Sequence, residues 1–577
     1  MSRQMDVSSP TPAPQPAASP PERLGLALSG GGFRASFFHL GVLARLADIG
    51  LLRSVSVIST VSGGTIVGAY YFVHLKKLLE TNAAPTDDDY RALVRDVQVD
   101  FLEGVRKNIR GRILLNPFKN YRMALGRKYS RSDRVGDLYD RYLYKKAWGD
   151  PEKRGGRDPR ERQIELRWLV TKPAEYKGEE PFNPWVHNQA LAAKVPILVM
   201  NATSLNTGHN WRFEAVRMGE PEPEDPKAKA LLESIDVNER LEQAYFKLPD
   251  VDQREPAVPA LQQDFPLAKA VAASACVPLL FHPLSVSDMY GGRRVQLVDG
   301  GVHDNQGVQA LFDMECDAAI ISDASGLMPD RHKPPPLAIP VAQRTMSIYG
   351  TRVRIEQLIR AHNELQPQAA LMHLLSGVPA GTVPPGARLE IPPGPPLTDY
   401  GINRDVQRCL ARLRTDLDSF ADAEAFSLMY SGYKMSAFEI DGWAAGNPGM
   451  AGLVKAPPNA PGWCFQPVAE LAGSDKPPAG YMRLLDAGKS LFFKSLLALP
   501  LVPRIAGALA VLGLLSGAIF GVVWGALRSG FDLGPVSNWW WFAVIALLPA
   551  LVSILAVLQL LGGRIFLWLG SAARLPG

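Results

Sequence analysis

Two consecutive strand–turn–helix units near the N-terminus limit the folds open to this chain more than any other feature. In residues 24–50, a short apolar run is followed by three glycines and then by apolar residues at helical spacing. Residues 55–79 repeat this plan with a β-branched run, a turn and a second helical pattern. Two such units in succession predict an α/β fold with a mainly parallel central sheet.

The turns of both units are expected at one edge of that sheet. In parallel sheets the carboxyl ends of the strands share an edge, and binding and catalytic residues gather there. Further apolar runs at 197–201, 295–298 and 318–322 predict additional strands. The glycine turn at 30–32 and the turn at 59–64 are therefore expected to lie close together.

Composition divides the chain into four predicted regions. Residues 1–22 are rich in Ser, Pro and Ala and predict a disordered tail. Residues 23–345 are predicted as a catalytic domain, in which a charged helical cap is inserted at about 87–190. Residues 346–490 predict a helical C-terminal extension, and residues 491–577 a membrane region. Long amphipathic helices are predicted at 345–365 and 405–434.

The C-terminal region contains two long apolar runs, 505–527 and 539–561, without a charged residue. At 1.5 Å per helical residue, each run is long enough for a hydrocarbon core of roughly 30 Å. Basic residues flank the outer ends, so the positive-inside rule places both termini in the cytoplasm. We expect an integral membrane protein with two transmembrane helices and its catalytic domain on the cytoplasmic face. The alternative is a pair of buried helices in a soluble core.

Charge and cysteine content limit the possible partners. The 62 basic and 57 acidic residues leave a net charge of +5, too small for a length of 577 residues to indicate nucleic-acid binding. The four cysteines have neither paired spacing nor nearby histidines that would predict a metal site. The sequence therefore predicts no cofactor, no metal and no nucleic-acid partner.

Ser62 and Asp299 are the candidates for nucleophile and base. Ser62 lies between an apolar strand and a helix in Thr-Val-Ser-Gly-Gly, the setting of a nucleophile elbow. Asp299 ends another apolar strand and precedes Gly300 and Gly301, so its carboxylate could deprotonate Ser62. Each motif has a plainer interpretation: a turn or phosphate cradle for the serine, and an Asp-Gly turn for the aspartate.

The glycine turn before the first helix is the candidate oxyanion hole. Its backbone N–H groups lie at a helix N-terminus, where the helix dipole favours negative charge. Gly30, Gly32 and Ala35 also satisfy a G-x-G-x-x-A dinucleotide pattern. That pattern requires an acidic residue at the end of the second strand, which here ends in Ser-Thr-Val-Ser, and a nucleotide site is therefore disfavoured.

The ordered set of motifs over residues 24–325 resembles the patatin-like phospholipases. Within that family, the chain resembles a membrane-anchored, bacterial-type member. The set comprises the glycine turn with its following Arg, the serine elbow, the Asp-Gly-Gly motif, and two further segments at 201–208 and 273–281. The resemblance implies a three-layer α/β/α fold with a Ser62–Asp299 dyad. It further implies oxyanion donors at Gly31 and Gly32, assisted by Gly30, and supporting roles for Arg34, which braces the loop, and for Gly63, Gly64, Gly300 and Gly301. The chain departs from the family pattern at Thr60 and Ala35.

The expected function is hydrolysis of a lipid acyl ester at the membrane surface, of phospholipase A or lysophospholipase type, through an acyl-serine intermediate. Three alternatives remain open. The same residues could transfer the acyl group to another acceptor. A Ser-His-Asp site could use His362 or His373 as the base. The chain could also be a catalytically silent membrane scaffold that binds anionic lipids.

Overall fold

The computed structural model describes residues 20–114, 131–149, 163–222, 226–248, 254–278, 280–326, 328, 333–334, 336–365, 368–378, 395–460, 462–490, 494–498 and 564–571. No helix in these ranges has the length and apolarity that a membrane span requires. The predicted disordered tail, apart from residues 20–22, and both predicted spans, 505–527 and 539–561, lie outside the described residues.

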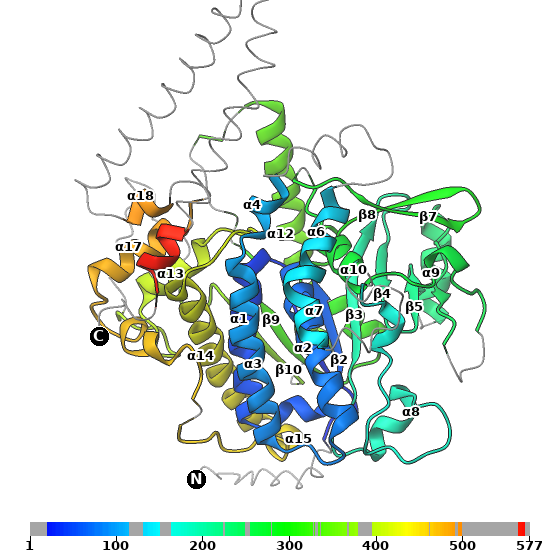
Figure 1. The fold of residues 1–577 in the computed structure, drawn as a ribbon, viewed down its shortest axis with the longest axis horizontal. Helices are drawn as coiled ribbons and strands as arrows, with labels where there is room; N and C mark the ends of the chain where they lie inside the picture. Colours follow the sequence, from blue (N-terminus) through cyan, green and yellow to red (C-terminus); the bar gives the residue numbers. More distant parts are fainter. Residues whose placement is uncertain are drawn as a thin grey trace, which may run out of the picture.

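The fold is built on a ten-stranded sheet with a parallel centre, as the sequence predicts (Figure 1). Its parallel strands lie in the order β10-β9-β1-β2-β3, and antiparallel strands extend it beyond β3. The strands are β1 Leu24–Leu28, β2 Val55–Val61, β3 Ile197–Ser204, β4 Asn210–Phe213, β5 Arg217–Gly219, β6 Ala244–Tyr245, β7 Leu284–Tyr290, β8 Arg293–Asp299, β9 Ala318–Asp323 and β10 Ala369–His373.

Helices cover both faces of the sheet and give it three layers. Side chains of β1 alternate between the two cores: Leu26 and Leu28 face the larger core, and Ala27 faces the smaller one. The larger core includes residues of α1, α2, α10 and α14, and the smaller core is covered by α11 and α12. In Figure 1, α1, α2 and α3 lie in front of the sheet.

The helices of the described residues are α1 Gly32–Asp48, α2 Gly63–Thr81, α3 Asp87–Arg106, α4 Ile109–Leu114, α6 Arg131–Tyr139, α7 Lys145–Trp148, α8 Pro184–His187, α9 Pro226–Ile235, α10 Leu267–Ser274, α11 Val308–Asp313, α12 Ala338–Leu365, α13 Arg404–Arg412, α14 Asp422–Gly446, α15 Pro448–Ala451, α16 Ala469–Ala472, α17 Ala479–Ala487 and α18 Lys494–Ala498. The predicted cap region is helical over α3, α4, α6 and α7. Of these, α3 packs directly on α1 and α2 in the helical layer.

The C-terminal half is joined closely to the first strand–turn–helix unit. Helix α14 lies along α1 at the flank of the sheet (Figure 1). Gly41 and Gly432 allow this approach, since a side chain at either position would overlap backbone of the opposite helix. Strand β10, which sequence analysis does not predict, adds another parallel strand next to β9.

The predicted helix at 405–434 is wrong in its middle. The structure has two helices, α13 and α14, separated by a connecting segment at 413–421. Arg414 of this segment is fully buried and forms ion pairs with Asp418 and Glu424. These buried ion pairs hold the chain in a non-helical path, although its apolar residues recur at helical spacing. The connecting segment 413–421 runs beneath the glycine turn described below.

Candidate active site

Ser62 occupies a sharp turn between β2 and α2. Its backbone has φ 50° and ψ −116°, a conformation that residues other than glycine rarely adopt. The Ser62 N–H donates to Ser274 Oγ at 3.0 Å, and Ser274 Oγ lies 2.7 Å from the Thr65 hydroxyl. Ser274, at the end of α10, therefore holds the backbone of the turn in place.

The elbow packs directly against β1 and the glycine turn. A side chain at Gly63 would overlap the carbonyl oxygen of Gly32, and one at Gly64 would overlap that of Leu28. Thr60, where the chain departs from the family pattern, is accommodated because Gly68 leaves room for its methyl group. Its hydroxyl donates to Val199 O at 2.9 Å.

Asp299 reaches the same edge of the sheet from the opposite direction. Strand β8 is antiparallel to β3, and Asp299 pairs with Ala202 of β3. The preceding residue of β3, Asn201, pairs with Val61 at the end of β2. The carboxyl end of β8 thereby lies beside the carboxyl ends of β2 and β3. The Asp299 N–H donates to Cys276 O at 2.9 Å, which fixes the backbone of the aspartate.

The Asp299 carboxylate lies in a nearly closed interior. Burial raises its pKa to about 6, and the hydrogen bond from the Gly301 N–H and the nearby Ser62 hydroxyl oppose this shift. The Gly301 N–H donates to Oδ1 at 2.8 Å. Oδ2 accepts no regular hydrogen bond from the described residues, so this oxygen remains available as an acceptor. Ser62 and Asp299 are 6% and 5% exposed.

The glycine turn lies next to the elbow. Gly31 and Gly32 have φ of 143° and 58°, and a Cβ on Gly30 would lie 3.2 Å from that of Ser62. The Gly30 N–H donates to Asn305 O at 2.9 Å, so it is not available as the assisting oxyanion donor that sequence analysis predicts. Within the described part of the chain, the N–H groups of Gly31 and Gly32 have no acceptor.

Arg34 connects the glycine turn to the C-terminal half. Its guanidinium is 2% exposed and donates to Leu413 O and Ala324 O at 3.0 Å each, and to Ala411 O at 3.2 Å. The Phe33 N–H also donates to Asp416 O of the connecting segment, at 3.2 Å. These contacts fit the bracing role that the resemblance implies for Arg34.

The histidine alternatives do not fit this geometry. His373 ends β10, and strands β9 and β1 separate it from β2. Three strand spacings of about 4.8 Å each are too far for a hydrogen bond to Ser62. His362 is exposed on α12. His39 is buried between Ser29 O and Ser322 Oγ, and burial lowers its pKa to about 4, as expected for a neutral structural histidine.

Sequence reasoning missed several residues of this site. Asn305 connects the Asp299 loop to Gly30, and Ser274 supports the elbow. Ser274 lies within a segment noted for its family resemblance, which was a usable signal. Asn305 has no such signal beyond its position shortly after Asp299. The sequence predicts helix for the connecting segment 413–421, and nothing in its pattern indicates a contact with the glycine turn.

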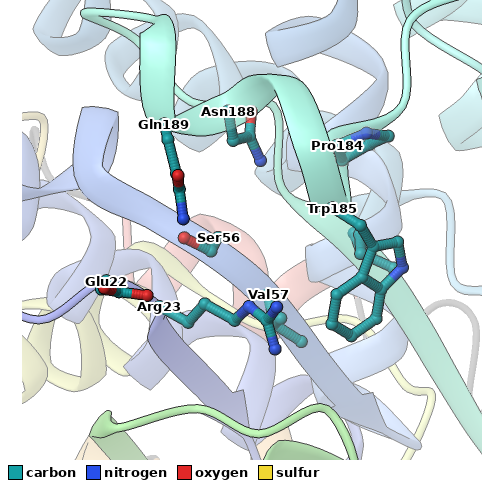
Figure 2. Close-up of a pocket in the computed structure, with 9 residues that line it drawn as sticks. Glu22, Arg23, Ser56, Val57, Pro184, Trp185, Asn188 and Gln189 are labelled. Carbon is teal, nitrogen blue, oxygen red and sulfur yellow. The ribbon is translucent and has the colours of Figure 1, made fainter.

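Two hollows away from these residues do not suit a lipid. One, at the amino ends of β1 and β2, is lined by Arg23, Ser56, Trp185 and their neighbours (Figure 2). Its volume of about 20 Å³ holds little more than one water molecule. The other, of about 480 Å³, is lined mainly by charged side chains that include Arg212, Glu220 and Lys229.

Comparisons with known proteins show what this chain is similar to. The family model for patatin-like phospholipases matches residues 26–312. Human GIVD cytosolic phospholipase A2 is 13% identical over 75% of this chain and 62% of that chain, with a TM-score of 0.34. Its complex with methyl gamma-linolenyl fluorophosphonate is 18% identical over 34% of this chain and 23% of that chain, with a TM-score of 0.20. VipD from Legionella pneumophila is 14% identical over 97% of this chain and 89% of that chain, with a TM-score of 0.26.

The chain thus covers less than two thirds of the human chain in both of these comparisons. No curated protein matches it. The family match spans the glycine turn, the serine elbow and the Asp-Gly-Gly motif in a three-layer fold. Residues 26–312 of this chain therefore form a patatin-like phospholipase domain.

Proposed function

We propose that this protein hydrolyses acyl esters of membrane lipids, as a phospholipase A or lysophospholipase, with Ser62 as nucleophile and Asp299 as base. The observation that carries the proposal is the pairing of a serine in a strained turn with a buried carboxylate whose pKa is about 6. Strained backbone and a raised carboxylate pKa cluster at functional sites. Family membership supports lipid hydrolysis in general.

The proposed reaction has two steps. Ser62 Oγ attacks the ester carbonyl carbon while its proton passes to Asp299. The tetrahedral intermediate collapses, the carbon–oxygen bond to the alcohol breaks, and the alcohol leaves with the proton from Asp299. Water then attacks the acyl-serine, Asp299 takes its proton, and the fatty acid is released as that proton returns to Ser62.

The glycine turn supplies the proposed oxyanion hole. The Gly31 and Gly32 N–H groups lie at the N-terminus of α1, where the helix dipole adds positive potential. Donors aimed at the developing oxyanion stabilise the transition state more than the ground state. Gly30 contributes to the shape of the turn through Asn305, rather than as a donor. Because Ser62 and Asp299 are almost closed off, entry of an acyl chain requires the side chains above them to separate.

We also propose that the runs at 505–527 and 539–561 anchor the protein in a membrane, with the catalytic domain on the cytoplasmic face. Support comes from the described residues on either side of this stretch. Ala498 and Phe566 belong to one apolar cluster with Ala421 and Ala487. The described residues before and after the two runs therefore lie close together, as the two ends of a hairpin would. That place adjoins the connecting segment 413–421, which contacts the glycine turn.

The direct test is a product assay. The purified protein is incubated with nanodiscs of phospholipid and, separately, with nanodiscs that also contain lysophospholipid. A phospholipase A is expected to release free fatty acid and lysophospholipid in equal amounts from the first, and a lysophospholipase to release free fatty acid from the lysophospholipid of the second, as measured by mass spectrometry. Loss of phospholipid with the acyl chain recovered on another lipid would indicate acyl transfer instead. Binding to both kinds of nanodisc without any product would favour the silent scaffold and contradict the proposal.

The pH dependence of the reaction should report the Asp299 carboxylate. The base must be ionised to accept the Ser62 proton, so kcat/KM is expected to fall below an apparent pKa of about 6 and to level off above it. The measurement is kcat/KM for a soluble p-nitrophenyl ester from pH 4.5 to 8.5, with thermal unfolding recorded at each pH. A flat profile between pH 5 and 7 in folded protein would rule out this assignment of the base.

A further inference from the structure

Tyr139, in the predicted cap, is held against the site by two contacts of its helix. Helix α6 packs on α10, which ends at Ser274, the residue that supports the elbow. Ser132 of α6 lies 3.0 Å from Cys276 Sγ, and the carbonyl of Cys276 accepts the N–H of Asp299. Tyr139 is the last residue of α6, directly before a π-helical turn at Asp140–Tyr144. Such turns are frequent at functional sites.

The Tyr139 hydroxyl is buried without a partner. The side chain is 0% exposed, and its hydroxyl makes no hydrogen bond within the described residues. Burying a hydroxyl costs free energy when no protein group replaces the hydrogen bonds that it made with water. A ligand that supplied an acceptor would remove that penalty.

The charged groups that act on Tyr139 come from both halves of the site. Its pKa is raised well above the usual range, chiefly by burial and further by repulsion from Asp299, Cys276 and Asp416. Asp299 is the proposed base, and Asp416 accepts the N–H of Phe33 in the glycine turn. Tyr139 therefore remains a neutral O–H donor at any working pH, within electrostatic range of both the base and the glycine turn.

Three other tyrosines of the described residues have buried hydroxyls without partners, but none of them has a residue of the dyad among the groups that act on its pKa. Tyr70 is repelled by Asp100 and Glu103, and Tyr71 by Tyr90. The charged neighbours of Tyr90 are likewise remote from the dyad. Among these four tyrosines, Tyr139 alone has Asp299 among the charged groups that act on it.

We propose that the Tyr139 hydroxyl donates a hydrogen bond to the ester carbonyl oxygen of the bound lipid as that oxygen becomes an oxyanion. This role rests on the proposed function and adds a catalytic residue to the dyad and the two glycine N–H groups. It assigns the cap a part in the chemistry. The phenol loses no hydrogen bond within the protein when it turns to the substrate, because it has none to break.

The test compares Tyr139→Phe with Tyr70→Phe, which removes an equally buried and unpartnered hydroxyl from α2. Loss of one oxyanion donor typically lowers kcat about 100-fold or more, so Tyr139→Phe is expected to reduce kcat and kcat/KM together by roughly that factor. Tyr70→Phe should remain within twofold of wild type. Both are measured with a p-nitrophenyl ester and with phospholipid in mixed micelles.

Two further readouts separate catalysis from structure. The thermal unfolding midpoint of Tyr139→Phe should not fall, because the substitution removes a polar group without a partner. Its inactivation by a fluorophosphonate, whose phosphoryl oxygen imitates the oxyanion, should slow in parallel with kcat. Any of three results for Tyr139→Phe would overturn the proposal. These are a rise in KM alone, a fall in the unfolding midpoint large enough to account for the lost activity, and activity equal to that of Tyr70→Phe.

Failure of this inference is distinguishable from failure of the proposed function. If wild type hydrolyses esters and Ser62→Ala does not, while Tyr139→Phe matches Tyr70→Phe, only the role of Tyr139 is wrong. If wild type releases no product, or Ser62→Ala keeps its activity, the proposed function itself is wrong.

Discussion

Replacement of Ser62 by alanine is expected to lower kcat for ester hydrolysis by at least about 10⁴-fold, the scale seen when a serine nucleophile is removed. Alanine lacks the oxygen that attacks the ester, and within the described residues the structure offers no other serine in the same strained turn beside Asp299. The measurement is steady-state hydrolysis of a soluble ester, together with covalent labelling by a fluorescent fluorophosphonate. Labelling should disappear in Ser62→Ala.

Asp299→Asn should reduce kcat nearly as far, by roughly 10³- to 10⁴-fold. Asparagine has the same shape, but its amide cannot take the serine proton. Asp304→Asn is the matched control for this variant. Asp304 is also buried, five residues further on, and its carboxylate accepts backbone N–H groups of Gln306, Gly307 and Gln309.

Ser56→Ala is the matched control for Ser62→Ala. Ser56 lies in β2 at the opposite edge of the sheet and lines the small cavity shown in Figure 2. Neither control should lose more than a few-fold in kcat. Retention of a tenth of wild-type activity by Ser62→Ala, or of full activity by Asp299→Asn, would place the reaction elsewhere in the molecule.

The parts of the fold that the sequence predicts well are those with strong local patterns. The apolar run at 24–28 and the glycines after it define β1 and the start of α1, because local chemistry alone requires a strand and a sharp turn there. The positions of Ser62 and Asp299 at one edge also agree with expectation. The sequence does not predict the antiparallel direction of β8, because an apolar run shows where a strand lies but not which way it runs.

The residues that sequence reasoning missed depend on contacts between distant segments. Tyr139 lies on a cap helix that packs on α10, and no motif around it indicates a role at the site. The connecting segment 413–421 is held by buried ion pairs, whose formation depends on tertiary placement rather than on helical periodicity. The availability of the Gly30 N–H similarly depends on Asn305, 275 residues away in sequence.

Arg34 provides the second large expected effect, on stability and activity together. Its guanidinium satisfies three backbone carbonyls in the interior, those of Ala324, Ala411 and Leu413. Burial lowers its pKa to about 10, against an opposing contribution from Asp323. Arg34→Met would leave these carbonyls without a donor, at a cost of about 1–3 kcal/mol for each unsatisfied group, less whatever water can reach them.

We therefore expect Arg34→Met to destabilise the fold by about 3 kcal/mol or more, and to reduce kcat in protein that remains folded. The reduction in kcat follows because the brace between the glycine turn and the connecting segment 413–421 is lost. Arg34→Lys should have a stability and a kcat between those of wild type and Arg34→Met, because a single ammonium cannot reproduce the planar guanidinium that bonds three oxygens. Thermal unfolding and kcat per folded molecule are the two measurements.

Arg45→Met is the matched control on the same helix. Arg45 is also buried, but its ion pair is with Asp441, whose side chain is 59% exposed. Pairs with so exposed a partner contribute about 0–1 kcal/mol, so this variant should unfold only slightly earlier than wild type and keep its kcat. Equal unfolding midpoints for Arg34→Met and Arg45→Met would show that the three carbonyls find other donors. Unchanged kcat in Arg34→Met would show that the glycine turn keeps its shape without the brace.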